Sequence, residues 1–252
     1  MKIHHLKGYI QSIYLVEKDN QLALLDGCSR ADIETIESFI KNDLKLSLDC
    51  LKLVVVTHMH PDHAGAASFL KSKWGCHIAA HPKVNSWYKG FLGHLKYEID
   101  LFLTHYVAKK MKKQKRPIRF PKKISIDFHL SDGDQLPFFP DWKALFCPGH
   151  TDCDLTLWHE KSKTAYIADN IIKIRKKIVS PYPVNYPDIY RDSLRRYLKL
   201  EIENYLLAHG GEAKIGTSEI EKFILNAPRE AVNHRQVVKR VFKNFEKHNY
   251  FG

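Results

Sequence analysis

The sequence predicts a mixed α/β (α+β) fold, formed by residues 1–252 as a single domain. Two patterns predict this class. Short apolar runs rich in β-branched residues recur along the chain, and they alternate with segments whose apolar residues repeat at helical spacing. The length suits one domain with a sizeable core, and no internal repeat or low-complexity linker divides it.

The elements follow from these patterns in chain order. The expected strands are short apolar runs bounded by turn residues, near 9–17, 21–26, 51–56, 76–80, 124–130, 141–147, 154–160 and 163–168. The expected helices carry their apolar residues on one face and span about 31–41, 64–74, 91–113, 189–200, 217–226 and 229–246. The last two place C-terminal helices over about 217–247.

The main chemical signal is a cluster of metal-type side chains directly after the apolar run 53–56. His58, His60, Asp62 and His63 stand within six residues. Imidazoles this close repel one another once protonated, so we expect a metal ion to hold them. Beyond the end of a strand, His58 and His60 share one side of the chain and can grip one ion. Pro61 turns the chain, so Asp62 and His63 can face a second ion.

Three further candidate ligands follow other predicted strands. They are His150 after a Pro-Gly turn, Asp169 after an apolar strand, and His209 after the apolar strand 204–208 and before two glycines. In each case a strand ends and a small residue lies next to the candidate ligand. This repetition predicts that the three side chains gather at one edge with the first cluster.

On these residues the chain resembles the metallo-β-lactamase superfamily of metal-dependent hydrolases. The matching segments are THMHPDHAG at 57–65, PGHT at 148–151, Ala168-Asp169 and Ala208-His209-Gly210. The resemblance implies a four-layer αβ/βα sandwich, with two mixed sheets face to face, helices outside and metals at one edge. It also implies the ligand sets: His58, His60 and His150 for a first ion, Asp62, His63 and His209 for a second, and Asp169 as the bridge.

Details of the motifs indicate a branch of that superfamily. His60 stands where the superfamily's diiron flavoproteins carry a carboxylate, which disfavours reduction of oxygen or nitric oxide. Asp169 matches the bridging carboxylate of branches similar to glyoxalase II and the lactonases, and it disfavours antibiotic hydrolysis. The chain also lacks room for the extra domain of the superfamily's nucleases.

The predicted function is hydrolysis by a dinuclear site. A hydroxide that bridges two Zn²⁺ ions would attack the carbonyl of a thioester, ester or lactone, because coordination lowers the pKa of water from about 15.7 to near 7. Asp62 is the candidate catalytic residue, able to protonate the leaving group. Zinc suits a His-rich, carboxylate-bridged site without thiolates, and iron or manganese could use the same ligands.

Charge indicates the kind of partner. The net charge is +12, with basic clusters at 109–123 and at 173–177, so we expect a small-molecule substrate that is anionic or bears an acyl group. Lys173, Tyr182 and Tyr186 are candidate substrate contacts. A phosphodiesterase or nuclease acting on nucleic acid ranks lower, since no RNA-binding signature is present. A mononuclear iron persulfide dioxygenase is a third alternative.

The predicted insertion at about 86–123 contains the long helix over 91–113. Its apolar face consists of residues at helical spacing, namely Leu92, Leu95, Ile99, Phe102 and Tyr106. A run of lysines follows, and Pro117 stops the helix. Two interpretations stay open: a surface helix with a solvated basic tail, or a cap over the metal site whose apolar face lines a substrate channel.

The remaining features predict a cytoplasmic protein. No apolar run approaches the roughly 20 residues that span a bilayer, and the first residues form no apolar signal segment. The five cysteines are odd in number and scattered, which favours reduced thiols over a disulfide framework.

Overall fold

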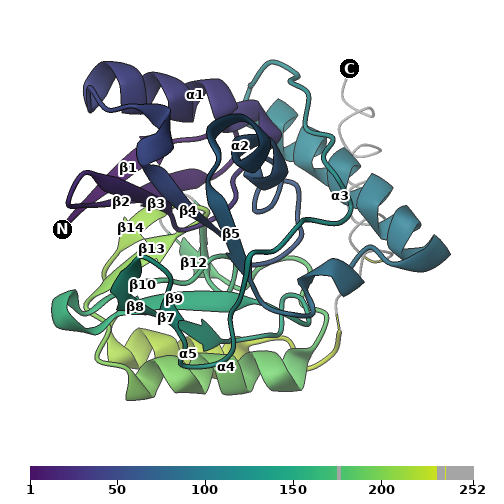
Figure 1. The fold of residues 1–252 in the computed structure, drawn as a ribbon. Helices are drawn as coiled ribbons and strands as arrows, with labels where there is room; N and C mark the ends of the chain where they lie inside the picture. Colours follow the sequence, from purple (N-terminus) through teal and green to yellow (C-terminus); the bar gives the residue numbers. More distant parts are fainter. Residues whose placement is uncertain (175–176, 232–235, 237–252) are drawn as a thin grey trace.

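The computed structural model describes residues 1–174, 177–231 and 236. Two six-stranded sheets lie face to face (Figure 1). The strands of the first sheet are, in spatial order, β1 (Lys2–Lys7), β2 (Ser12–Lys18), β3 (Gln21–Leu24), β4 (Leu51–Val56), β5 (His77–Ala80) and β6 (Phe128–His129). Those of the second are β14 (Gly211–Ala213), β13 (Asn204–Leu207), β10 (Thr164–Tyr166), β9 (Leu155–His159), β8 (Phe139–Phe146) and β7 (Gln135–Leu136). A separate hairpin joins β11 (Ile172–Ile174) to β12 (Lys177–Val179).

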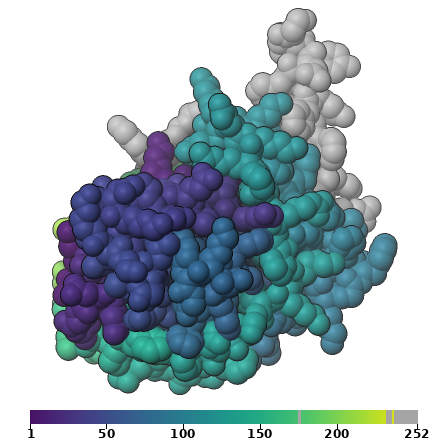
Figure 2. Space-filling model, turned by 45° about the horizontal axis from the view of Figure 1, so that its top comes forward, coloured from purple at the N-terminus to yellow at the C-terminus, as the bar shows by residue number. Residues whose placement is uncertain are grey.

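Helices cover the outer faces of both sheets. The α-helices are α1 (Ile33–Ser38), α2 (Ala67–Trp74), α3 (Gly90–Lys110), α4 (Pro187–Lys199) and α5 (Thr217–Asn226). Short 3₁₀ turns occur at Arg30–Asp32, Leu48–Cys50, Val84–Ser86 and Glu160–Ser162, and a π turn at Phe39–Asp43. Figure 1 shows α1, α2 and α3 on the side of the first sheet and α4 and α5 on that of the second. Figure 2 views the molecule from the side of α1 and α2, where these elements form the surface.

Strand β4 shows why the sequence forms four layers. Leu53 and Val55 pack into the core between the two sheets, whereas Val54 and Val56 pack into the core beneath the helices. Because successive side chains of a strand point to opposite faces, a strand covered on both faces must be apolar throughout. The unbroken apolar run at 53–56 in β4 is therefore the sequence signature of a sheet buried between layers.

The predicted fold class is confirmed, and two elements, β4 and α5, have the predicted bounds. The strand expected near 124–130 is reduced to β6. The prediction missed β1, whose polar sequence buries only His4 and Leu6. It also missed β7, β11, β12 and β14, which are two or three residues long and too short to show a period. Of the helix expected over 229–246, residues 229–231 are not helical, and the rest lies outside the described residues except for residue 236.

Helix α3 forms where predicted, but it packs with a different face. Its buried residues are Gly93, Tyr97, Asp100, Leu101, Thr104 and Ala108. In the apolar set that the spacing singled out, Leu92 is 73 % exposed, Leu95 52 % and Phe102 41 %. The predicted apolar face is thus not the packing face. The helix is held instead by a mixed face in which small and polar side chains allow close approach.

A helix that crosses a membrane must be both long and apolar, which bears on the helices of the described residues. None of them meets both conditions.

Candidate metal centre

All seven predicted metal ligands meet at one edge of the sandwich, beyond the ends of four strands. The segment 57–63 follows β4, His150 follows β8, Asp169 follows β10 and His209 follows β13. We call this edge of the sandwich, with the loops that carry these seven residues and the adjoining segment 25–29, the ligand edge. The ligand-type atoms of the seven residues form two groups, and within each group they lie within 4.8 Å of one another: His58, His60, His150 and Asp169 in the first, and Asp62, His63 and His209 in the second.

Asp169 stands between the two groups. Its Oδ1 lies 3.3 Å from Nε2 of His63 and 3.4 Å from Nε2 of His209. Its Oδ2 lies 3.5 Å from Nε2 of His150. One carboxylate thus faces both groups with different oxygens, which is the geometry a bridging ligand needs.

Asp26, in the turn after β3, orients the second group. Its Oδ2 accepts hydrogen bonds from Nδ1 of His63 at 2.6 Å and from the hydroxyls of Thr57 and Tyr166, each at 2.8 Å. Its Oδ1 accepts from the backbone N–H groups of Gly27 and Thr57. Because a carboxylate only accepts, His63 carries its proton on Nδ1 and presents Nε2 to the site.

Thr57 extends the same network to His58. Its hydroxyl proton is donated to Asp26, so its oxygen, 3.1 Å from Nδ1 of His58, accepts the proton of that ring. Asp154 lies behind at 3.9 Å from the same nitrogen, and it is held by the N–H and hydroxyl of Thr151. His58 therefore also presents Nε2 to the site.

Backbone carbonyls orient two further rings. His150 donates from Nδ1 to the carbonyl of Pro183 at 2.6 Å, and His209 donates from Nδ1 to that of Ile10 at 3.2 Å. Gly149, at φ +146°, lets the chain before His150 pass against Tyr190 of α4, where an added Cβ would lie 2.4 Å from the Tyr190 backbone.

His60 differs from the other four histidines, since it turns Nδ1 toward the site. This atom is 3.1 Å from Nε2 of His58 and 3.0 Å from Nε2 of His150. Its Nε2 points the other way, toward Asp100 of α3 at 3.7 Å. Hydrogen bonds to outer groups thus orient four of the five rings, and the fifth, His60, faces Asp100.

The electrostatics of the ligand edge favour a cation. Burial, reinforced by the neighbouring rings of His63, His60 and His150, holds the pKa of His58 well below its usual value, so this ring is neutral. Burial also opposes the charge of His63, but Asp169, Asp62 and Asp26 outweigh it and raise the pKa of this imidazole. The pKa of Asp169 is held low by His63 and His209 against the effect of burial. Buried carboxylates of this kind are stabilised by a positive partner, which a metal ion supplies.

Three carboxylates of this network were missed as functional residues: Asp26, Asp100 and Asp154. Asp26 had a sequence signal, because it follows a buried strand and precedes a glycine, like the predicted ligands. Asp154 lies four residues after His150, in a segment whose sequence shows only an ordinary turn pattern. Asp100 lies inside a helix, forty residues after His60. For these two, the sequence offers no local signal.

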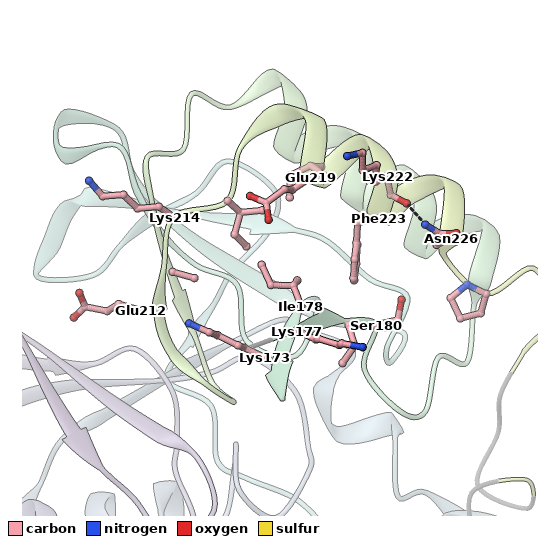
Figure 3. Close-up of a pocket in the computed structure, with 15 residues that line it drawn as sticks. Lys173, Lys177, Ile178, Ser180, Glu212, Lys214, Glu219, Lys222, Phe223 and Asn226 are labelled. Carbon is pink, nitrogen blue, oxygen red and sulfur yellow. Dashed lines mark hydrogen bonds between the residues drawn. The ribbon is translucent and has the colours of Figure 1, made fainter. Parts of the chain in front are cut away.

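A pocket of about 880 Å³ adjoins the ligand edge, between α5, the β11–β12 hairpin and β14 (Figure 3). We call it the lysine pocket. Its basic residues are Lys173, Lys177, Lys214 and Lys222. In the described part of the chain, no carboxylate pairs with any of them, although Glu212 and Glu219 also line the pocket. Phe223 reaches from α5 toward Ile178 and gives the pocket an apolar floor (Figure 3).

The lysine pocket and the ligand edge share a wall. The backbone N–H of Lys173 donates to the carbonyl of His209 at 2.7 Å, and a Cβ added to Gly210 would lie 2.4 Å from Cβ of Lys173. Lys173, a candidate substrate contact, is thus next to a candidate ligand. Arg175 and Lys176 of the predicted basic cluster lie outside the described residues.

The other two candidate contacts lie in the Pro-rich segment before α4. Tyr182 and Tyr186 are both partly exposed. The backbone of this segment supports His150: besides the Pro183 carbonyl, the Asn185 side chain donates to the His150 carbonyl at 2.6 Å. The segment therefore helps to hold the ligand edge, and its phenols stay predicted substrate contacts.

Comparison with known proteins identifies the family. The model of a family described as the metallo-beta-lactamase superfamily matches residues 6–209, which include every predicted ligand. The chain belongs to the metallo-beta-lactamase superfamily. A curated relative, the probable metallo-hydrolase YflN of Bacillus subtilis, is 22% identical over 231 residues, which cover 82% of this chain and 83% of that protein.

Solved structures of other superfamily members share the fold. The metallo-beta-lactamase family protein TTHA1429 of Thermus thermophilus matches with a TM-score of 0.64 at 20% identity, over 88% of this chain and 77% of that one. The protein TTHA1623, solved in a di-iron-bound form, matches with a TM-score of 0.60 at 19% identity, over 88% of this chain and 98% of that one. At these identities the likeness concerns the fold, a superfamily sandwich with a His/Asp cluster at one edge.

Proposed function

We propose that this protein is a dinuclear metal-dependent hydrolase that acts on the carbonyl of a thioester, ester or lactone in a small anionic or acyl-bearing substrate. The observation that carries the proposal is the placement of Asp169 between two groups of nitrogen and oxygen ligands. Membership of the superfamily and the similarity to a probable metallo-hydrolase support it.

The residues of the ligand edge fit two ions. His58, His60 and His150 would hold the first, Asp62, His63 and His209 the second, and Asp169 both. The ions would supply an activated water near neutral pH and would polarise the carbonyl. Zinc suits this donor set, and iron and manganese are alternatives. The similar protein TTHA1623, solved in a di-iron-bound form, supports iron among the two.

Asp62 is the proposed proton carrier. Its Oδ2 lies 3.2 Å from Nε2 of His209 and 3.6 Å from Nε2 of His63. Burial opposes its ionisation, but His63 and His209 outweigh burial and lower its pKa, so Asp62 is a carboxylate that can accept a proton. It would take a proton from the attacking water and pass it to the departing alkoxide or thiolate.

The lysine pocket supports an anionic substrate. Four lysines without paired carboxylates in the described structure create a positive field beside His209, and the floor at Ile178 and Phe223 is apolar. A substrate with an anionic group on an apolar stem would satisfy both surfaces. The reacting carbonyl would then reach the ligand edge past Lys173, with Tyr182 and Tyr186 as further proposed contacts.

Two alternatives from the sequence predict different outcomes. A phosphodiesterase would use the same ions and the same positive field. A mononuclear iron persulfide dioxygenase needs one iron and consumes oxygen. The second ligand group supports two ions and favours hydrolysis over the dioxygenase.

The test combines metal analysis with a substrate panel. The purified protein is loaded with zinc or iron, its bound metal is quantified, and thioesters, esters, lactones and phosphodiesters are assayed with oxygen uptake followed in parallel. We expect two ions per chain, turnover of a carbonyl substrate, loss of turnover with a chelator and recovery on adding metal. Two ions with turnover of phosphodiesters alone, or one iron with oxygen consumption, would overturn the proposal.

A further inference from the structure

The ring nitrogen of His60 that points away from the site faces a residue of helix α3. Asp26, Thr57, Pro183 and Ile10, which orient the other four rings, belong to strands and turns of the sandwich itself. His60 instead faces Asp100, a buried residue in the middle of α3. The ring and the carboxylate come from segments forty residues apart.

Coordination chemistry requires an acceptor at this point. A neutral imidazole that presents Nδ1 to an ion keeps its proton on Nε2, and a buried N–H without an acceptor costs free energy. His60 is buried, and its Nε2 points at Oδ2 of Asp100 at 3.7 Å. This separation is longer than a direct hydrogen bond, so a small rotation of either side chain or a bridging water completes the contact.

Asp100 is itself held in place. The hydroxyl of Tyr88 donates to Oδ2 of Asp100 at 2.8 Å. Gly93, in the first turn of α3, lies against the backbone of Tyr88, where an added Cβ would be 2.3 Å from the carbonyl carbon. Tyr97 fixes the same helix to the following loop, because its hydroxyl donates to the Phe120 carbonyl at 2.7 Å and accepts from the Phe120 N–H.

We propose that Asp100, held by Tyr88, is a positioning residue that accepts the Nε2 proton of His60 and so fixes the ring that presents Nδ1 to the first ion. This inference rests on the proposed metal centre. It gives α3 a definite role: the helix contributes no ligand, yet it stabilises one ligand of the first group. Partners of this kind typically change metal affinity by about 10–100-fold when they are removed.

The test measures metal binding without relying on turnover. Zinc is titrated into the metal-free protein against a competing chelator, for the unchanged chain and for Asp100→Asn, Asp100→Ala and Tyr88→Phe. We expect one ion to bind about 10–100-fold more weakly in both Asp100 variants and several-fold more weakly in Tyr88→Phe, while the other ion binds as before. Glu98→Gln is the matched control on α3, because Glu98 is paired with Arg119 at the surface and should leave both affinities unchanged.

Stability of the metal-free protein separates positioning from folding. If Asp100 only supports α3, its variants lower the unfolding temperature of the metal-free protein and leave both zinc affinities of the folded fraction unchanged, which overturns the inference. Should the Asp100 variants not fold, equal zinc affinities in Tyr88→Phe and the unchanged chain overturn it. An unchanged chain that binds no zinc or iron would refute the proposed function and this inference together, whereas full binding in every variant would refute the inference alone.

Discussion

The ligand edge and the lysine pocket share a wall but are built in opposite ways. At the ligand edge each imidazole is buried or partly buried and faces an acceptor on its outer side, and one carboxylate, Asp26, accepts from five donor groups. In the lysine pocket, the lysines are partly or largely exposed, and among the described residues none has a paired carboxylate. The first region is preorganised for one chemistry, and the second attracts charge without fixing its position.

This difference indicates that the ligand edge determines the proposed activity and that the lysine pocket determines the proposed specificity. Preorganised groups in a buried site act strongly because they need no rearrangement and little water screens them. Exposed lysines act through a field that salt screens and that tolerates different ligands. We therefore expect substitutions at the ligand edge to abolish function, and substitutions in the lysine pocket to adjust it.

The largest effect is expected for Asp169→Ala. Removing the carboxylate that faces both groups should weaken metal binding and lower turnover by about 1,000-fold or more, since several kcal/mol of transition-state stabilisation come from the ions. Bound metal and turnover are measured together, with Asp192→Ala, an exposed aspartate on α4, as the control. If Asp169→Ala kept two ions and most of the activity, the ligand edge would not be the catalytic site.

Asp26→Ala should be the most destabilising change at the ligand edge. It leaves five buried donors without their acceptor, and breaking such a network costs about 3–5 kcal/mol of unfolding free energy. Asp141 is the matched control, because it also binds more than one group, Lys18 and Lys161, but at the surface. Urea denaturation should show a loss of about 1 kcal/mol or less for Asp141→Ala. Equal losses for the two variants would contradict the preorganisation of the ligand edge.

A smaller effect, on recognition, is expected from the double variant Lys177→Ala/Lys222→Ala. It should raise KM for an anionic thioester by roughly 5–20-fold and leave kcat unchanged, because each exposed charge contributes up to about 1 kcal/mol. An uncharged thioester of the same length should show no change, and the difference should shrink as salt increases. Lys41→Ala/Lys143→Ala removes the same charge elsewhere and serves as the control. A fall in kcat without a change in KM would place these lysines outside substrate binding.

The same contrast explains what the sequence could predict. The gathering of the candidate ligands was predictable because each follows a strand end, and strand ends of one layered sandwich meet at one edge. The motif at 57–63 also carries four of the seven in one stretch. β4 was predictable to the residue because burial on both faces leaves an apolar, β-branched run that only the half-buried Lys52 interrupts.

What the sequence could not predict depends on contacts between distant residues. Asp100 reaches His60 only because α3 packs with Tyr97 and Leu101, whereas helical spacing singled out Leu92, Leu95 and Phe102. The lysine pocket could not be predicted for the same reason, since its lining combines a hairpin of three-residue strands with a helix some forty residues later in the chain. Local sequence patterns indicate where strands end. They do not show which face of a helix packs against the rest of the fold.

The smallest expected effect is on the rate at which a thiol reagent labels the cysteines. This rate reports how well the ligand edge is shielded from solvent. All five are free thiols, and four are buried. Burial raises the pKa of Cys147 to about 11 and that of Cys76 to about 12, so at pH 7.5 these side chains hold almost no thiolate, the reactive form. A thiol reagent should therefore label one residue of the native protein quickly, Cys50, and the other four only after denaturation.

Two buried thiols lie within the ligand edge and make the labelling informative. Cys28 donates from its Sγ to the Asp26 carbonyl at 3.2 Å, and the N–H of Cys153 donates to the hydroxyl of Thr151, a residue next to His150. Removing a bound metal would leave the carboxylates of this edge without a cation, so its loops should open more often and expose these two sulfurs. We expect chelation to accelerate labelling of Cys28 and Cys153 by a few-fold, as read by peptide mass analysis, and to leave Cys76 unchanged. Uniform acceleration would mean that the ion stabilises the whole fold, and no acceleration would mean that the protein scaffold alone keeps the ligand edge closed.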